Sequence, residues 1–229
     1  MEHILFLDIE TVPEMESYSQ LDIRMQQLWN KKAEKLKFTE EQTPAELYRK
    51  AGIYAEFGKV ICISVAYMKN NILRIKSFQS QEEKILLQDF ADLLHKYFSN
   101  NNNRLCAHNG KEFDFPYLCR RMLINGIAIP SILNIAGLKP WETKFLDTME
   151  LWKFGDYKHY TSLDLLAAVF EIPSPKENTD GSMVYELYWQ QKDYQQIKDY
   201  CERDVLTVAQ LFLRYQGKEL LQNEQIVHL

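Results

Sequence analysis

The stretch FLDIET at residues 6–11 decides how this chain is interpreted. With the apolar residues before it, the stretch predicts a short buried strand over residues 4–9. Alternate residues of a strand point to the same face, so Asp8 and Glu10 project together from its end. Two adjacent carboxylates repel each other unless a cation lies between them, and a divalent ion held by oxygen ligands is such a cation. The alternative is that the strand has simply reached solvent.

The size and composition of the chain fit one globular domain. Its 229 residues are enough to bury a large core, and 46% of them are hydrophobic. With only 8 Gly and 7 Pro, the chain is neither collagen-like nor a low-complexity segment. The 27 Lys and Arg against 32 Asp and Glu give a net charge of −5, which argues against a basic clamp for nucleic acid.

The cysteines and the apolar runs indicate the compartment. No two of Cys62, Cys106, Cys119 and Cys201 form a C-x-x-C pair, and each lies among apolar residues, which is typical of free buried thiols. The apolar run at residues 4–7 is too short for a signal peptide, and no run reaches the roughly 18 residues of a membrane span. We therefore expect a soluble cytoplasmic protein that does not bind membranes.

Hydrophobic periodicity predicts an α/β order of elements. Strands are predicted at residues 4–9, 59–68, 72–78, 104–107 and 145–148, and helices at 81–98, 113–125, 162–170, 183–191 and 193–215. The charge-rich residues 17–57 indicate an insertion of two helices after the first strand, and residues 127–182 are mostly loops. We expect a single domain over residues 1–229, with a mixed β-sheet flanked by helices.

Two further places carry acidic residues that a core does not need. Asn109 follows the predicted strand at 104–107, and Asp114 lies in the first turns of the next helix, where an acidic residue is often only a cap. In the last long helix, Tyr200 and Asp204 are four residues apart and share one face. A tyrosine at helical spacing is usually a core residue, so neither place is decisive alone.

Together, the three places form a recognisable set. Asp-x-Glu on the first strand, Asn-x3-Phe-Asp at a helix start and Tyr-x3-Asp on a late helix resemble the three motifs of the DEDDy exonucleases. These belong to the DnaQ-like 3′→5′ exonucleases with a ribonuclease H-like fold. The chain looks most like the proofreading exonuclease domain of B-family DNA polymerases, as a stand-alone bacterial nuclease. The sister group has His five residues before the last Asp, but that position here is Asp199.

The resemblance implies a catalytic mechanism. Asp8, Glu10, Asp114 and Asp204 would hold two divalent ions, Mg²⁺ or Mn²⁺, which suit all-oxygen sites. Asp8 would bridge both ions, Glu10 and Asp204 would complete the site of the nucleophilic water, and Asp114 would serve the second ion. Tyr200 would orient the attacking water, since a phenol is a poor base at neutral pH.

Three neighbours of these residues are candidates for binding the substrate. Thr11 and Asn109 could hydrogen-bond the terminal nucleotide, and Phe113 could stack against a base. The alternatives are that Thr11 caps the strand and that Phe113 belongs to the core. His108 is expected to be structural, and Asp147, at the end of a predicted strand, receives no role.

The expected function is therefore metal-dependent 3′→5′ hydrolysis of single-stranded DNA ends, releasing nucleoside 5′-monophosphates. RNA stays open as a substrate, because nothing in the sequence reads the 2′-hydroxyl. A second hypothesis is a nucleic-acid-binding module of the same fold without catalysis. A third, a hydrolase of small phosphoesters, lacks a Gly-rich phosphate loop or a G-x-S-x-G motif in this sequence.

Overall fold

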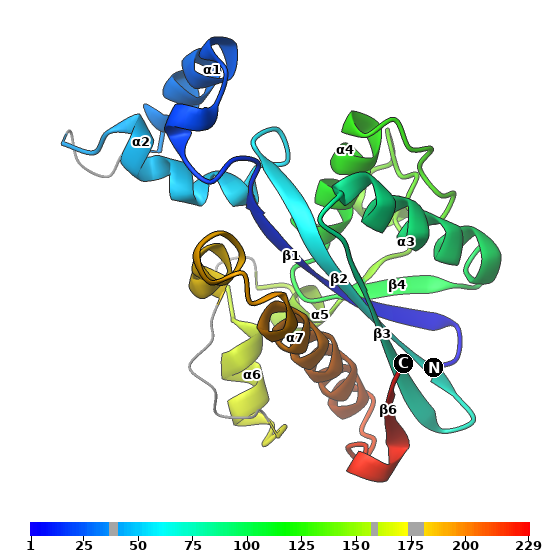
Figure 1. Ribbon diagram of the computed structural model, residues 1–229. Coiled ribbons are helices and arrows are strands. Elements are labelled where there is room, and N and C mark those ends of the chain that lie inside the picture. Colours follow the sequence, from blue (N-terminus) through cyan, green and yellow to red (C-terminus); the bar gives the residue numbers. More distant parts are fainter. Residues whose placement is uncertain (37–40, 157–159, 174–180) are drawn as a thin grey trace.

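The structure, a computed structural model, describes residues 1–36, 41–156, 160–173 and 181–229 and is built on one mixed β-sheet (Figure 1). The sheet has six strands in the order β5-β4-β1-β2-β3-β6. Their bounds are β1 Ile4–Pro13, β2 Gly58–Lys69, β3 Ile72–Gln79, β4 Arg104–Ala107, β5 Leu146–Asp147 and β6 Ile226–His228. The predicted α/β class and mixed sheet are confirmed.

Strand β1 lies in the middle of this sheet. It runs antiparallel to β2 and parallel to β4, and the β1–β2 register shifts between Glu10 and Thr11. Leu5 and Leu7 pack into one core cluster, whereas Ile4 and Phe6 pack into another. Even-numbered residues of the strand therefore face one side of the sheet, and the pleat carries Asp8 to that same side.

Helices cover the two faces of the sheet. The helices are α1 Ile23–Ala33, α2 Pro44–Leu47, α3 Glu83–Tyr97, α4 Asp114–Ile124, α5 Thr148–Lys153, α6 Leu163–Val169 and α7 Tyr194–Tyr215. Residues of α3 and α4 share the cluster of Leu5 and Leu7, and α7 packs on the face of Ile4 and Phe6. Figure 1 shows α7 on the opposite side of the strands from α3 and α4. The face that carries Asp8 is therefore the face that α7 covers.

The predicted insertion after the first strand is present and has its own small core. Its elements are α1, α2 and two 3₁₀ segments, Tyr18–Gln20 and Tyr48–Ile53, and it extends from the end of β1 in Figure 1. Trp29 is fully buried there, against Tyr48 and Phe57. The insertion is joined to α4, because the Tyr117 hydroxyl on that helix donates a hydrogen bond of 2.7 Å to the Gly52 carbonyl.

Several elements differ from the sequence-based predictions. Strand β1 extends to Pro13, and residues 186–191 form a π-helix (Glu186–Gln191) where an ordinary helix is predicted. The periodicity did not predict β6 or α5, because segments of three and six residues are too short for a hydrophobic pattern. Asp147 is the N-cap of α5, and its side chain accepts hydrogen bonds from the amides of Met149 and Glu150.

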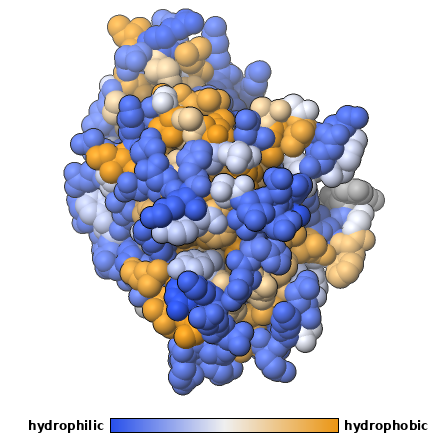
Figure 2. Space-filling model, turned by 90° about the vertical axis from the view of Figure 1, so that its right-hand side faces the viewer, coloured by the Kyte–Doolittle hydropathy of each residue, from blue (hydrophilic) through white to orange (hydrophobic). Residues whose placement is uncertain are grey.

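On the side that Figure 2 shows, the surface of the molecule is mostly hydrophilic, as expected when the apolar residues are buried in the core. Hydrophobic residues form separate patches on this side. Within the described ranges, no helix combines the length and the apolar character needed to cross a bilayer.

Candidate active site

The structure brings the four predicted carboxylates and Tyr200 together from three elements. Asp8 and Glu10 lie on β1, Asp114 is the first residue of α4, and Asp204 lies on α7. Burial raises the pKa of Asp8 well above its ordinary value, and the negative charges of Glu10, Asp204 and Asp114 raise it further. The four groups are therefore close enough to repel one another.

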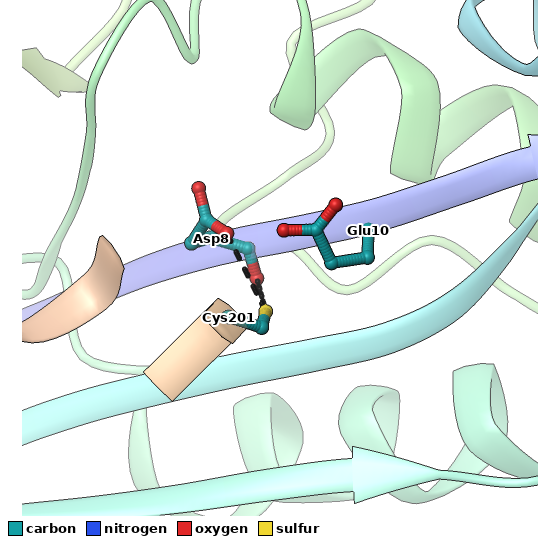
Figure 3. Close-up of side chains that lie close together, drawn as sticks. All are labelled: Asp8, Glu10 and Cys201. Carbon is teal, nitrogen blue, oxygen red and sulfur yellow. Dashed lines mark hydrogen bonds between the residues drawn. The ribbon is translucent and has the colours of Figure 1, made fainter. Parts of the chain in front are cut away.

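The tightest part of this group contains a residue that the sequence did not assign to the site. Oxygen atoms of Asp8 and Glu10 and the Sγ atom of Cys201 all lie within 4.8 Å of one another. Cys201 donates from Sγ to the carboxylate and to the main-chain oxygen of Asp8, at 3.4 Å each. Figure 3 shows the two carboxylates side by side along β1, with the thiol beside Asp8.

Burial makes the ionised forms of these acids unfavourable. Asp114 is only 4% exposed, and burial raises its pKa to about 7, with Asp147 adding to the rise. Asp204 is half-buried, and burial raises its pKa to about 6, although Tyr200 and Arg203 act against the rise. Among the described residues, the main influences on the pKa of Asp8, Glu10 and Asp114 include no positive charge.

The donor set fits divalent cations. Four carboxylates supply only oxygen ligands, which hard ions such as Mg²⁺ and Mn²⁺ prefer. A buried cluster of negative charges with little positive charge nearby is costly unless it is protonated or binds a metal. The thiol of Cys201 is occupied as a donor to Asp8, and burial raises its pKa, so it stays protonated and is a poor ligand.

Tyr200 lies in this group as the i, i+4 spacing predicts. Its hydroxyl donates a hydrogen bond to the carboxylate of Asp204, one turn further along α7. Burial, followed by the charges of Asp204, Glu10 and Asp8, raises the pKa of Tyr200 well above its usual range. The phenol therefore stays protonated at neutral pH and acts as a hydrogen-bond donor.

The three predicted substrate contacts have different surroundings. Thr11 hydrogen-bonds the hydroxyl of Tyr117, and the Phe113 ring packs against the Tyr117 ring with centroids 5.3 Å apart. Phe113 also packs on the main core cluster, which favours the core interpretation. Asn109 differs, because its buried Oδ1 atom has no hydrogen-bond partner. Of the three, Asn109 has the atom most available to a ligand.

The raised pKa values predict how stability depends on pH. The folded-state pKa values of about 7 for Asp114 and about 6 for Asp204 exceed the unfolded value of 3.8, so the folded chain binds more protons between about pH 4 and 7. Without metal, its free energy of unfolding falls as the pH rises through that window. In chelator, we therefore expect a melting temperature several degrees higher at pH 5 than at pH 8. A pKa shift of one unit corresponds to about 1.4 kcal/mol of unfolding free energy, and each kcal/mol changes the melting temperature by about 2–4 °C.

Thermal unfolding with and without metal checks this prediction. Excess Mg²⁺ or Mn²⁺ is expected to raise the melting temperature mainly at pH 8, where the carboxylates are ionised. Asp114→Asn removes one of the titrating groups and is expected to shrink the pH dependence seen in chelator. An unchanged dependence in this variant would contradict the assignment of the shift to this cluster.

The chain is similar to known proteins in sequence and in fold. A family model described as a predicted 3′-5′ exonuclease related to the exonuclease domain of PolB matches residues 53–226, which include Asp114 and Asp204 but not β1. The family B DNA polymerase of the hyperthermophilic archaeon Pyrobaculum calidifontis is similar with a TM-score of 0.54 at 17% identity. No curated protein sequence matches the chain significantly.

The extent of these matches decides what they establish. The structural match covers 92% of this chain but 24% of the polymerase chain, so the present chain spans about a quarter of it. At 17% identity the likeness shows the fold alone, which is the ribonuclease H-like fold expected from the motifs. The family match covers about three quarters of the sequence. The chain therefore belongs to the family of predicted 3′-5′ exonucleases related to the exonuclease domain of PolB.

Proposed function

We propose that this chain is a metal-dependent exonuclease that shortens single-stranded DNA from its 3′ end and releases nucleoside 5′-monophosphates. The observation that carries the proposal is the convergence of four carboxylates from β1, α4 and α7 on one site that supplies little positive charge of its own. We propose further that residues 1–229 act as one exonuclease domain, because all described elements are arranged around a single sheet.

The carboxylates would bind the metal ions. Asp8, whose pKa is influenced by the charges of the other three acids, would be the central ligand, and Glu10, Asp114 and Asp204 would complete the set that holds the ions. When bound, such ions lower the pKa of a water molecule and neutralise charge on the phosphodiester. The chain's own part is to hold the carboxylates together in a partly buried site, where their repulsion disfavours the metal-free state.

Tyr200 would position the water that attacks the phosphodiester. Its hydroxyl already binds Asp204, one of the proposed metal ligands, and it stays protonated. A protonated phenol does not remove a proton from water, but it can fix the orientation of a neighbouring oxygen. Tyr200 is therefore assigned to orientation rather than to base catalysis.

Tyr200→Phe tests this assignment. The substitution keeps the ring and removes the hydroxyl, so we expect kcat to fall about 10- to 100-fold, the cost of imperfect orientation of reacting groups. The KM should change less than threefold, because the hydroxyl is not assigned to substrate binding. Steady-state kinetics over a range of oligonucleotide concentrations would measure both constants. Wild-type kcat in this variant would contradict the role, and Tyr194→Phe, also on α7, is a matched control.

Asn109 is the proposed contact to the terminal nucleotide. Its Oδ1 atom is a buried acceptor without a partner, and such a group costs about 1–3 kcal/mol unless a ligand or water satisfies it. A hydroxyl or amino group of the last nucleotide could donate to it. Thr11 and Phe113 remain weaker candidates, because each is already engaged with Tyr117.

Matched oligonucleotides decide the substrate. A 5′-labelled single-stranded DNA and an RNA of the same sequence would be incubated with the protein in Mg²⁺, in Mn²⁺ and in chelator. We expect a ladder of DNA products shortened from the 3′ end, with no cleavage in chelator. Faster shortening of RNA would make the protein an exoribonuclease, and binding of both strands without cleavage would favour the inactive module.

A further inference from the structure

A buried carboxylate beside the site has an unusual set of partners. Asp147, at the end of β5, is only 2% exposed. Its Oδ1 atom accepts from the amides of Met149 at 3.0 Å and Glu150 at 3.3 Å, which start α5. The same carboxylate also accepts from two amides of the β4–α4 loop, Asn109 to Oδ1 and Lys111 to Oδ2, each at 3.0 Å. Only the first pair of bonds is needed to cap a helix.

The loop that Asp147 binds has a specific backbone conformation. Asn109 has φ +59°, in the left-handed region, which Asn adopts more readily than most non-glycine residues. Gly110 fits because a Cβ there would lie 2.4 Å from the Cβ atom of Ala107. His108 adds two bonds of 2.9 Å, one between Nδ1 and the Thr148 hydroxyl and one between Nε2 and the Thr161 carbonyl.

This loop connects two parts of the proposed reaction centre. It begins after β4 and leads into Asp114, and it carries Asn109 with its unpaired Oδ1 atom. Asp147 is also close enough to Asp114 for its charge to act on that carboxylate. From the β5–α5 side, the carboxylate of Asp147 binds this loop at the amides of Asn109 and Lys111.

We propose that Asp147 is a positioning residue, which fixes the 108–111 loop through the amides of Asn109 and Lys111 so that the Asn109 Oδ1 atom is presented to the terminal nucleotide. The inference rests on the proposed function, whose site it extends. Asp147 itself touches no reacting group. Its removal should therefore act on catalysis mainly through Asn109 and the loop, and secondarily through the loss of its charge beside Asp114.

Asp147→Asn removes one of the two loop contacts and keeps the helix cap. An Asn side chain can keep its oxygen toward the Met149, Glu150 and Asn109 amides and remains a good N-cap, but its NH₂ group then faces the Lys111 amide, where an acceptor is required. The matched control is Asp22→Asn, which makes the same change at the N-cap of α1, where the carboxylate accepts from the Met25 amide at 2.8 Å and, among the described residues, from no amide of a separate loop.

Kinetics of a double-mutant cycle test the proposal. We expect Asp147→Asn to lower kcat/KM about 10- to 100-fold, as small misplacements in a reaction centre do, while Asp22→Asn stays within threefold of wild type. Asn109→Ala should cause a similar loss, and adding Asp147→Asn to it should cost less than a further threefold. Multiplying losses in the double variant would overturn the proposal, as would wild-type kcat/KM in Asp147→Asn.

Amide hydrogen exchange gives a readout independent of turnover. In Asp147→Asn the amide of Lys111, which loses its acceptor Oδ2, is expected to exchange at least tenfold faster, whereas the amides of Asn109, Met149 and Glu150, which share Oδ1, change less than threefold. Unchanged exchange at Lys111 would also overturn the proposal. If the wild-type protein cleaves neither DNA nor RNA, both the proposed function and this inference are wrong. If it cleaves and Asp147→Asn cleaves equally well, only the inference fails.

Discussion

Asp8→Asn is expected to lower exonuclease turnover on the order of 10³-fold, the scale on which single electrostatic groups of a reaction centre act. Asp8 interacts with Glu10, Asp114 and Asp204, so it would be the central ligand of the proposed metal centre. The amide of Asn has the same shape but carries no charge, and it offers one oxygen where the carboxylate offers two. The loss should therefore appear in kcat at saturating substrate and in the affinity for Mn²⁺.

The same variant should be more stable than the wild type when metal is absent. The burial and mutual repulsion that raise the pKa of Asp8 also destabilise the folded metal-free chain, and Asn removes one of the repelling charges. We expect a higher melting temperature in chelator at pH 8, together with a smaller rise on adding Mn²⁺. Asp89→Asn, at an exposed position of α3, is the matched control. Wild-type turnover in Asp8→Asn would contradict the assignment, and a lower melting temperature in chelator would contradict the repulsion argument.

Arg121→Ala is expected to lower the free energy of unfolding by about 3–5 kcal/mol, the cost of removing one partner of a buried ion pair. Arg121 is 4% exposed on α4, and its Nη2 atom lies 2.5 Å from the Glu83 carboxylate on α3. Its Nη1 atom donates to the Ala55 carbonyl at 2.8 Å, and Nη2 also donates to Glu14 at 3.0 Å. One guanidinium thus joins α3, the end of the insertion and the residue after β1.

Chemical denaturation would measure the loss, which corresponds to a melting temperature lower by roughly 6–20 °C. Much of it comes from leaving the Glu83 charge buried without its partner, so Glu83→Gln combined with Arg121→Met should be less destabilised than Arg121→Met alone. An equal or larger loss in the double variant would contradict this account. Arg120→Ala, at the neighbouring and more exposed position of α4, should change stability by less than about 0.5 kcal/mol.

The sequence predicts the parts of the fold that have a long repeating pattern. The strand that carries Asp8 and Glu10, the hairpin of β2 and β3, and helices α3 and α7 follow from runs long enough to show a period. Strand β6 does not, because its three residues form a strand only when β3 offers an edge to pair with. Such pairing depends on the folded chain rather than on a local pattern.

The residues of the candidate site also fall into two groups, those that the sequence predicts and those that it does not. The four carboxylates and Tyr200 could be found because their types and spacings repeat a known set of motifs, and the structure brings them together. Cys201 next to Tyr200 looks like any buried thiol in sequence, and its contact with Asp8 exists only once α7 lies on β1. The sequence gives no signal for the role of Asp147 either, because its partners are backbone amides, which every residue except proline offers.

The central claim is that Asp8, Glu10, Asp114 and Asp204 form one divalent-metal centre. A crystal of the full chain soaked in Mn²⁺, with anomalous diffraction data, tests it most directly. The account predicts two anomalous peaks roughly 3.5–4 Å apart, both within ligand distance of Asp8 oxygens, and their loss in Asp8→Asn crystals. Strong Mn²⁺ peaks elsewhere on the protein, with none among these four carboxylates, would contradict it.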